Sequence, residues 1–333
     1  MSAPIPDHAL IGRAKHIPTA ATTPTLSLSP LTLPIPGRLV PLQLRITIPT
    51  TGTHLPIILL SHGQGASNNL SSLNGYAPLV TFYSSHGFAV IQPTHLSSKT
   101  LLFPPESLID GPLCWRSRVQ DFKDILDRAE DIEASFEAAK GRLDWTSVGA
   151  VGHSMGAHTA CMLLGAQSKK LNALTHELEI INMIEPRVKA GVLIGAPGCD
   201  PGGETQSAMA RKVAPFFADT SFKEMITPAL VVFGDEDVPD YLTTRGVEWH
   251  RDPYTLSGGR KDLLTVYGAG HIFGGVSGWD AKECDDESVE RCEVVARLTW
   301  AYLRSQLVEG DGSWEVACEA LKGLEGIGMV ESK

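Results

Sequence analysis

The sequence predicts an α/β fold, in which helices cover both faces of a mostly parallel central sheet. Continuous apolar runs such as PIILL and PALVVF are typical of strands that are buried on both faces. These runs alternate with helical segments over most of the chain, and such alternation favours parallel strands joined by helices. We find no internal repeat and no second segment with a core of its own, so a single domain is expected.

Length and composition limit the classes of protein to which the chain can belong. It has 333 residues, 43% of them hydrophobic and 20% charged, which is typical of a globular protein. The net charge of -10 argues against nucleic acid as the main partner, because proteins that bind it need basic surfaces. The apolar runs are too short to cross a bilayer, so we expect no membrane span. The oligomeric state stays open.

The N-terminal stretch and the cysteines indicate the compartment. MSAPIPDHALIGRAKHIP contains no basic segment followed by an apolar one, so we expect no secretory signal. The six cysteines form no C-x-x-C pair, which favours free and largely buried thiols in the cytoplasm. If any cysteines do pair, the candidates are Cys284, Cys292 and Cys318 near the C-terminus.

The first part of the chain predicts an arm followed by the start of the sheet. Residues 1–37 are rich in Pro, Thr and Ser and predict an N-terminal extended arm, either a lead-in strand or a partly ordered segment. The α/β domain follows over 38–333. LVPLQLRITIP at 39–49, LPIILLSHGQG and FAVIQP predict strands, and YAPLVTFYSSHG predicts a helix that Gly87 ends.

The rest of the chain continues the alternation. Apolar residues at helical spacing predict a long helix over 115–140, which Gly141 ends. A strand in SVGAVGHS and a small-residue helix in MGAHTACMLLGA follow. VKAGVLIGAP, TPALVVFGDED and KDLLTVYGAGH predict three further strands, and a last helix is expected over about 287–307. Four stretches between these elements are expected to cover the active-site crevice: near 94–118, 166–187, 199–227 and 239–260.

Ser154 lies in the motif GHSMG, directly after a predicted strand. A serine between Gly152 and Gly156 at such a junction is typical of a nucleophile elbow, although the glycines and a serine cap could also serve only to turn the chain. A serine nucleophile needs a base, and the base needs an acid to hold its tautomer. FGDEDVP supplies an acid after a later strand and GAGH supplies His271 after the last one, in the order that an elbow predicts.

The chain resembles the serine esterases of the α/β-hydrolase fold, and within them the dienelactone-hydrolase, chlorophyllase and acetylhydrolase-like group. The resemblance covers about residues 40–307 and rests on LLSHGQG, GHSMG, FGDEDVP and GAGH. Such enzymes carry a glycine three residues before the acid. Here this glycine corresponds to Gly234, and the acid to Asp237. The resemblance therefore implies Asp237 as the acid, with Asp235 as the alternative, more simply a cap of the turn, and Asp240 after it. Serine stands where dienelactone hydrolases carry cysteine, which favours an ordinary ester.

Two backbone N–H groups are expected to bind the oxyanion of the tetrahedral intermediate. One belongs to Met155, the residue after the nucleophile. The resemblance implies that the other belongs to the residue after the His-Gly pair, here Gln64, with Gly65 as the alternative. We expect His62 to order this loop by hydrogen bonding. For His153 and His158 we expect no catalytic part.

Aromatic residues near the motifs are candidates for an apolar acyl or alcohol pocket. Phe273 lies beside the histidine, and Trp249 and Tyr254 lie between the acid and the histidine. Other aromatic residues between core elements are as readily explained by packing: Phe103, Trp115, Phe216, Phe217 and Trp279. The acidic stretch DAKECDDESVE is most simply a solvated start of the last helix. No metal-ligand spacing and no complete dinucleotide-binding motif is present, so we expect no cofactor and no metal.

These features predict a serine esterase that cleaves a hydrophobic carboxylic ester through an acyl-enzyme. A lactone, a polyester or a chlorophyll-like ester all stay possible as substrates. An acyltransferase, in which an alcohol replaces water, and a non-catalytic ligand-binding protein on the same scaffold are the alternatives. No long apolar lid of the lipase kind is present, so we do not expect interfacial activation.

Overall fold

The computed structural model describes residues 9–65, 67, 69–104, 107–108, 111–171 and 178–333. Parts of three predicted segments therefore lie outside the described residues. They are 1–8 of the arm, 105–106 and 109–110 of the stretch 94–118, and 172–177 of the stretch 166–187.

The central sheet has nine strands in the order β1-β2-β4-β3-β5-β8-β10-β11-β12. Its middle strands are parallel: β4 (Ala89–Pro93), β3 (Leu55–Ser61), β5 (Leu143–His153), β8 (Val188–Ile194), β10 (Ala229–Gly234) and β11 (Lys261–Val266). The antiparallel strands lie toward the two edges: β1 (Thr25–Leu33), β2 (Leu42–Pro49) and β12 (Gly328–Ser332). The prediction of a mostly parallel α/β sheet is confirmed.

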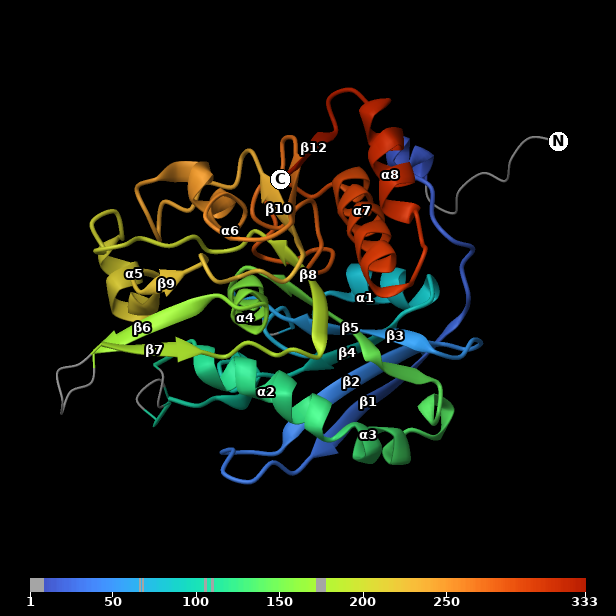
Figure 1. Cartoon of the computed structure of the whole chain (residues 1–333), viewed down its shortest axis with the longest axis horizontal. Helices are drawn as coiled ribbons and strands as arrows, with labels where there is room; N and C mark the ends of the chain where they lie inside the picture. The colour runs from blue at the N-terminus through green and yellow to red at the C-terminus, as the bar shows by residue number, and fades with distance from the viewer. Residues whose placement is uncertain (1–8, 66, 68, 105–106, 109–110, 172–177) are drawn as a thin grey trace.

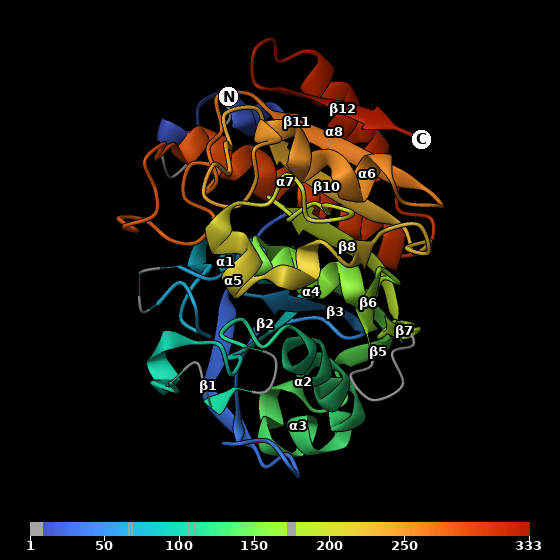
Figure 2. The same cartoon turned by 90° about the vertical axis from the view of Figure 1, so that its left-hand side faces the viewer.

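Helices cover both faces of this sheet (Figures 1 and 2). One face carries α2 (Trp115–Asp127), α3 (Ala129–Ser135) and α4 (Met155–Leu163). The other carries α1 (Ala77–Ser85), α7 (Val289–Leu307) and α8 (Ser313–Lys322). Successive side chains of a strand point to opposite faces, so Ile57 and Leu59 of β3 enter the first core and Ile58 and Leu60 enter the second. This two-sided burial explains the continuous apolar run in β3.

The N-terminal arm is a lead-in strand. It begins with the 3₁₀ helix η1 (Ala9–His16) and continues as β1, which pairs with β2 at the edge of the sheet. Pro30 lies within β1, and an edge strand tolerates a proline because one side of it needs no hydrogen-bond donor. The arm is tied to α7, since the backbone N–H of Arg13 donates to Glu290 Oε1 over 2.6 Å.

The segments between the core elements carry short structure of their own. A small antiparallel sheet joins three strands, which are β7 (Leu178–Asn182), β6 (Gln167–Leu171) and β9 (Thr220–Ser221). The other pieces are short helices: η2 (Lys99–Leu101), α5 (Ala208–Val213), η5 (Pro215–Phe217), η6 (Gly246–Arg251) and α6 (Asp252–Thr255). In Figure 1, α5, β9 and β6 gather on the left.

Two expectations about the helices need correction. The helix predicted over 115–140 breaks at Arg128, whose φ of -112° and ψ of 28° leave the helical region, and the 3₁₀ helix η4 (Glu137–Ala139) follows α3. The break redirects the chain so that Ile132 and Phe136 reach the same core as α2. The last predicted helix is confirmed as α7, but α8 and β12 follow it without having been predicted.

No described helix is long and apolar enough to cross a bilayer. The six cysteines all lie among the described residues and are free thiols, so the three candidates for pairing near the C-terminus form no disulfide.

Candidate active site

Ser154, Asp237 and His271 come together at the carboxyl ends of β5, β10 and β11. Nδ1 of His271 donates to Asp237 Oδ2 over 2.9 Å, with Oδ1 at 3.1 Å. Nε2 of His271 accepts from Ser154 Oγ over 2.9 Å. The carboxylate is buried, with 3% of its side chain exposed, whereas the histidine is 27% exposed. The three side chains form one hydrogen-bonded chain that leads from a buried acid to a partly exposed hydroxyl.

The backbone at Ser154 is strained, and the two glycines around it are needed for packing. Its φ of 56° and ψ of -122° lie where side-chain-bearing residues are rare, and such strain is typical of functional sites. A Cβ on Gly152 would lie 2.0 Å from the carbonyl oxygen of Gly156, and a Cβ on Gly156 would lie 2.0 Å from that of Ser61. The sharp turn from β5 into α4 therefore requires glycine at both positions.

For both Asp237 and His271, the effect of charged and hydrogen-bonding neighbours on the pKa outweighs the effect of burial. Burial alone would raise the pKa of Asp237, but His271 and His250 outweigh it and hold that pKa well below its usual range. Burial alone would lower the pKa of His271, but the carboxylate and its hydrogen bond outweigh it and raise that pKa above its ordinary value. Asp237 is therefore ionised, and the imidazole is made a stronger base.

Sequence reasoning missed a second histidine beside the acid. His250, at the end of η6, is buried; its Nδ1 donates to the Ala196 carbonyl over 2.7 Å, and its Nε2 lies 3.3 Å from Asp237 Oδ2. Donor atoms of Asp237, His250 and His271 all lie within 4.8 Å of one another, close enough for one metal ion. Here Asp237 and His271 are hydrogen-bonded to each other. No motif marks position 250 in the sequence.

Three backbone N–H groups of the loop after β3, those of residues 63–65, differ in whether they have an acceptor among the described residues. The N–H of Gly63 donates to Tyr76 Oη over 2.9 Å, and that of Gly65 donates to Ser71 Oγ over 3.1 Å. The N–H of Gln64, between them, has no acceptor among the described residues. This difference favours Gln64 over Gly65 as an oxyanion donor.

This loop lies against the start of α4, where Met155 is the first helical residue. A Cβ on Gly156 would lie 2.9 Å from the carbonyl oxygen of His62. His62 orders the loop as expected, since its Nδ1 donates to the Gly63 carbonyl over 2.7 Å and its Nε2 accepts from the His95 N–H over 3.1 Å. Burial holds the pKa of His62 well below its ordinary value, which agrees with this neutral tautomer.

His153 links the elbow to the loop of the triad histidine. Its Nδ1 accepts from Tyr76 Oη over 2.8 Å, and its Nε2 donates to the backbone carbonyl of His271 over 2.7 Å. Burial lowers the pKa of His153 to about 3, so the ring is neutral at ordinary pH. Its role is to fix the positions of neighbouring groups.

The acidic stretch before α7 holds the site loops, so the expectation that it is only solvated is wrong. Oδ2 of Asp286 accepts from the N–H groups of Gly270 and Gly274, on either side of the triad histidine, over 3.0 and 3.1 Å. Glu283 accepts from the N–H and the Oγ of Ser67 over 2.6 and 2.5 Å. Both contacts join segments that are distant in sequence.

The three aromatic residues expected to line a pocket are packed in the interior. Trp249 is 1% exposed and donates from Nε1 to the Cys199 carbonyl, and Phe273 is 0% exposed. The ring of Tyr254 faces Lys333 Nζ at 5.3 Å. None of these three side chains forms an exposed apolar surface in this structure.

Other aromatic rings gather one turn beyond Ser154. His158 of α4 packs against the rings of Trp115, Phe216 and Phe217, with ring centroids 4.9 to 5.9 Å from its own. Burial lowers the pKa of His158 to about 3, so it is a neutral member of this cluster. Apolar groups therefore border the helix that begins directly after Ser154.

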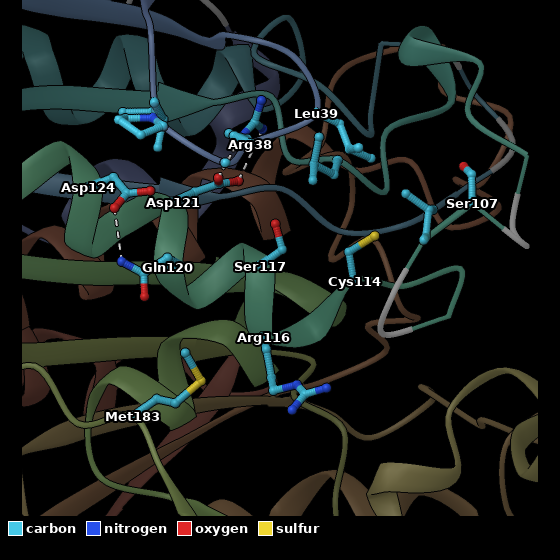
Figure 3. Close-up of a pocket in the computed structure, with 15 residues that line it drawn as sticks. Arg38, Leu39, Ser107, Cys114, Arg116, Ser117, Gln120, Asp121, Asp124 and Met183 are labelled. Carbon is cyan, nitrogen blue, oxygen red and sulfur yellow. Dashed lines mark hydrogen bonds and ion pairs between the residues drawn. The ribbon is translucent and has the colours of Figure 1, made fainter.

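A cavity of about 580 Å³ lies beside α2, away from the triad (Figure 3). Its wall combines apolar side chains, such as Leu39, Leu108 and Met183, with the carboxylates of Asp121 and Asp124. No triad residue is among the described residues that line it. This cavity is a separate feature of the molecule.

Protein-family models and curated proteins provide no match to this chain. The functional interpretation therefore rests on the geometry of the site.

Proposed function

We propose that the chain is a serine esterase of the α/β-hydrolase fold, which cleaves a hydrophobic carboxylic ester through an acyl-enzyme. The observation that carries this proposal is the hydrogen-bonded chain from Asp237 through His271 to Ser154, with 2.9 Å at each link. The strained backbone of the serine and its place after the central strand β5 support the same assignment.

The reaction begins with the formation of a tetrahedral intermediate. Ser154 Oγ attacks the ester carbonyl carbon while His271 Nε2 takes the hydroxyl proton. The negative charge of Asp237 stabilises the imidazolium that results. The carbonyl oxygen becomes an oxyanion, which accepts hydrogen bonds from the N–H groups of Gln64 and Met155.

The remaining steps release the products. The tetrahedral intermediate collapses, the bond to the alcohol oxygen breaks, and His271 returns the proton to that oxygen. A water molecule then attacks the acyl carbon, giving its proton to the same histidine, and the acid leaves as Ser154 regains its proton. The proposed steps use only side chains and backbone amides of this chain.

A hydrophobic ester is the substrate class that the surroundings favour. The aromatic cluster of Trp115, Phe216 and Phe217 borders α4. The net charge of -10 disfavours a strongly anionic substrate, which the protein as a whole would repel. We also propose a cytoplasmic location, because all six cysteines are free thiols.

Hydrolysis of a series of p-nitrophenyl esters of increasing acyl length tests the proposal. We expect the wild type to hydrolyse at least one member and Ser154→Ala to hydrolyse none. A fluorophosphonate should label the wild type once per chain and should not label Ser154→Ala. The acyl length that gives the highest kcat/KM measures the size of the acyl site.

Ser135→Ala is the matched control, because Ser135 is an exposed serine at the end of α3 that only donates to the Asp131 carbonyl. It should react like the wild type. A folded wild type that neither hydrolyses any ester nor takes the label would reject the esterase in favour of a ligand-binding protein.

A further inference from the structure

Arg118 is a buried cation that forms no direct ion pair with any of the residues that the structure describes. It lies in α2 and is 0% exposed. Within the described part of the chain, all of its acceptors are neutral: Thr159 Oγ1 at 3.1 Å, Ser97 Oγ at 2.8 Å, Ser61 Oγ at 3.4 Å and the backbone carbonyl of His62. A buried charge without a counter-ion is costly, so its presence calls for a reason.

The carboxylate next along the helix, that of Asp121, attracts this charge through space, but its hydrogen bonds among the described residues go to other groups. Asp121 accepts from Arg38 Nε over 2.8 Å and from His95 Nδ1 over 2.8 Å, as Figure 3 shows for the contact with Arg38. Burial lowers the pKa of Arg118 only to about 10, so the guanidinium keeps its charge at neutral pH.

Arg118 fixes the first peptide of the oxyanion loop. The His62 carbonyl accepts from its Nη2, and the Gly63 N–H at the other end of the same peptide donates to Tyr76 Oη. A peptide group is planar, so these two contacts together set its orientation.

The next peptide carries the free donor. Its carbonyl, that of Gly63, accepts from His62 Nδ1. Because the C=O and N–H of a trans peptide point in opposite directions, the Gln64 N–H points away from that bond. The Gln64 side chain donates to the Ser97 carbonyl over 3.0 Å, and Ser97 Oγ accepts from Arg118. The guanidinium is therefore linked to residue 62 directly, through the His62 carbonyl, and to residue 64 through Ser97.

Arg118 also contacts the helix that carries the other donor. Thr159 Oγ1 accepts from Arg118 Nε and donates to the Met155 carbonyl over 3.1 Å. The guanidinium therefore bonds directly to the loop of Gln64, and it is linked to the first turn of α4 through the hydroxyl of Thr159.

We propose that Arg118 is a positioning residue for the oxyanion hole: it holds the peptides that carry the Gln64 and Met155 N–H groups in a fixed relative position, and its positive charge stabilises the oxyanion that forms at Ser154. This inference rests on the proposed esterase function. A fixed positive charge in a buried site acts most strongly on charge that develops in the transition state, so the effect should appear in kcat more than in KM.

The test compares Arg118→Met and Arg118→Lys with the wild type, using kcat per site labelled by a fluorophosphonate. For Arg118→Met we expect kcat to fall about 10- to 100-fold while KM changes less than about threefold. An alkylboronic acid, which forms an anionic tetrahedral adduct with the serine, should bind more weakly by a similar factor. Arg118→Lys keeps the charge but cannot reach all four acceptors, so it should lie between.

Arg142→Met is the matched control. Arg142 precedes β5 at the end opposite Ser154, and its guanidinium also donates only to carbonyls, those of Gly52, Ala138 and Pro49. Its loss should lower stability and leave kcat per labelled site unchanged. If Arg118→Met does not fold, Arg118→Lys and Thr159→Val provide the test, and both should lower kcat.

A folded Arg118 variant whose kcat per labelled site stays within about twofold of the wild type would overturn the inference while leaving the esterase intact. A wild type that takes no label and hydrolyses nothing would instead reject the esterase, and this inference with it.

Discussion

Oδ2 of Asp237 lies 3.3 Å from Nε2 of His250, so a second imidazole faces the acid of the triad. Nδ1 of His250 is 2.7 Å from the Ala196 carbonyl, which can only accept, so Nδ1 carries a proton. The contact with the carboxylate is attractive only when Nε2 carries a proton as well. The alignment of this contact is poor for a hydrogen bond, but both side chains are buried, so the imidazole packs directly against the carboxylate. We therefore expect His250 to hold Asp237 in place for His271.

Replacing His250 tests this role. His250→Leu removes the imidazole that packs against the carboxylate, and we expect kcat/KM to fall by less than about tenfold, because this contact is weaker than a full hydrogen bond to a charged group. His250→Gln keeps an N–H that can reach Asp237, so its loss should be smaller. Ester hydrolysis by the two folded variants measures the difference. Equal activity of His250→Leu and the wild type would mean that His250 only packs.

The two aspartates after β10 should differ sharply in their effect on activity. Asp237→Asn removes the charge that stabilises the imidazolium, so we expect kcat/KM to fall about 10³- to 10⁴-fold. Asp235 instead accepts from the Gly268 N–H over 2.6 Å at the surface, so Asp235→Asn should lower the melting temperature slightly and leave kcat/KM within about threefold. A larger loss for Asp235→Asn would reverse the assignment of the acid.

The pH dependence of the reaction follows from the pKa of His271. The reaction needs this histidine neutral, and Asp237 raises its pKa above the ordinary value of 6.5. As pH falls through the raised pKa the base is protonated, so kcat/KM should decline already above pH 6.5. In Asp237→Asn burial is opposed only by the smaller effect of Asp286, so the pKa of His271 should fall and the decline should move to lower pH. Profiles of kcat/KM for both proteins measure the shift, and profiles that coincide would contradict the coupling.

The triad could be predicted because each member directly follows a strand. Carboxyl ends of parallel strands meet at one edge of a sheet, so the order of motifs along the chain predicted that a serine, an acid and a histidine lie close together there. The choice of Asp237 over Asp235, and of Gln64 as an oxyanion donor, came from the resemblance to α/β-hydrolase esterases. The hydrogen bonds of the neighbouring amides then separate Gln64 from Gly65, and no pattern in the sequence contains those bonds.

Residues that only support the site residues, such as Arg118 and His250, could not be predicted in this way. Arg118 had a usable signal, because it lies three residues after Trp115 and four before Phe122, on the apolar stripe of α2, where a charge is out of place. His250 had none, since only the packing of η6 brings it to Asp237. The break at Arg128 also lacks a glycine or proline, so the apolar spacing alone predicted one continuous helix.

The elbow glycines provide a test of the fold itself. A Cβ on Gly156 would lie 2.0 Å from the Ser61 carbonyl oxygen, and a Cβ on Gly152 would lie 2.0 Å from that of Gly156. Both carbonyl oxygens belong to the backbone, so neither can rotate out of contact as a side chain could. We therefore expect Gly156→Ala or Gly152→Ala to lower the free energy of unfolding by at least about 3 kcal/mol.

Gly141→Ala is the control, because Gly141 has a φ of +67° but nothing within 4 Å of an added Cβ. It should cost only the strain of a left-handed alanine, about 1 kcal/mol. Urea unfolding followed by tryptophan fluorescence measures all three variants. If Gly156→Ala were as stable as Gly141→Ala, the close approach of β3 to α4 would be wrong, and with it the contact between the His62 carbonyl and the start of α4.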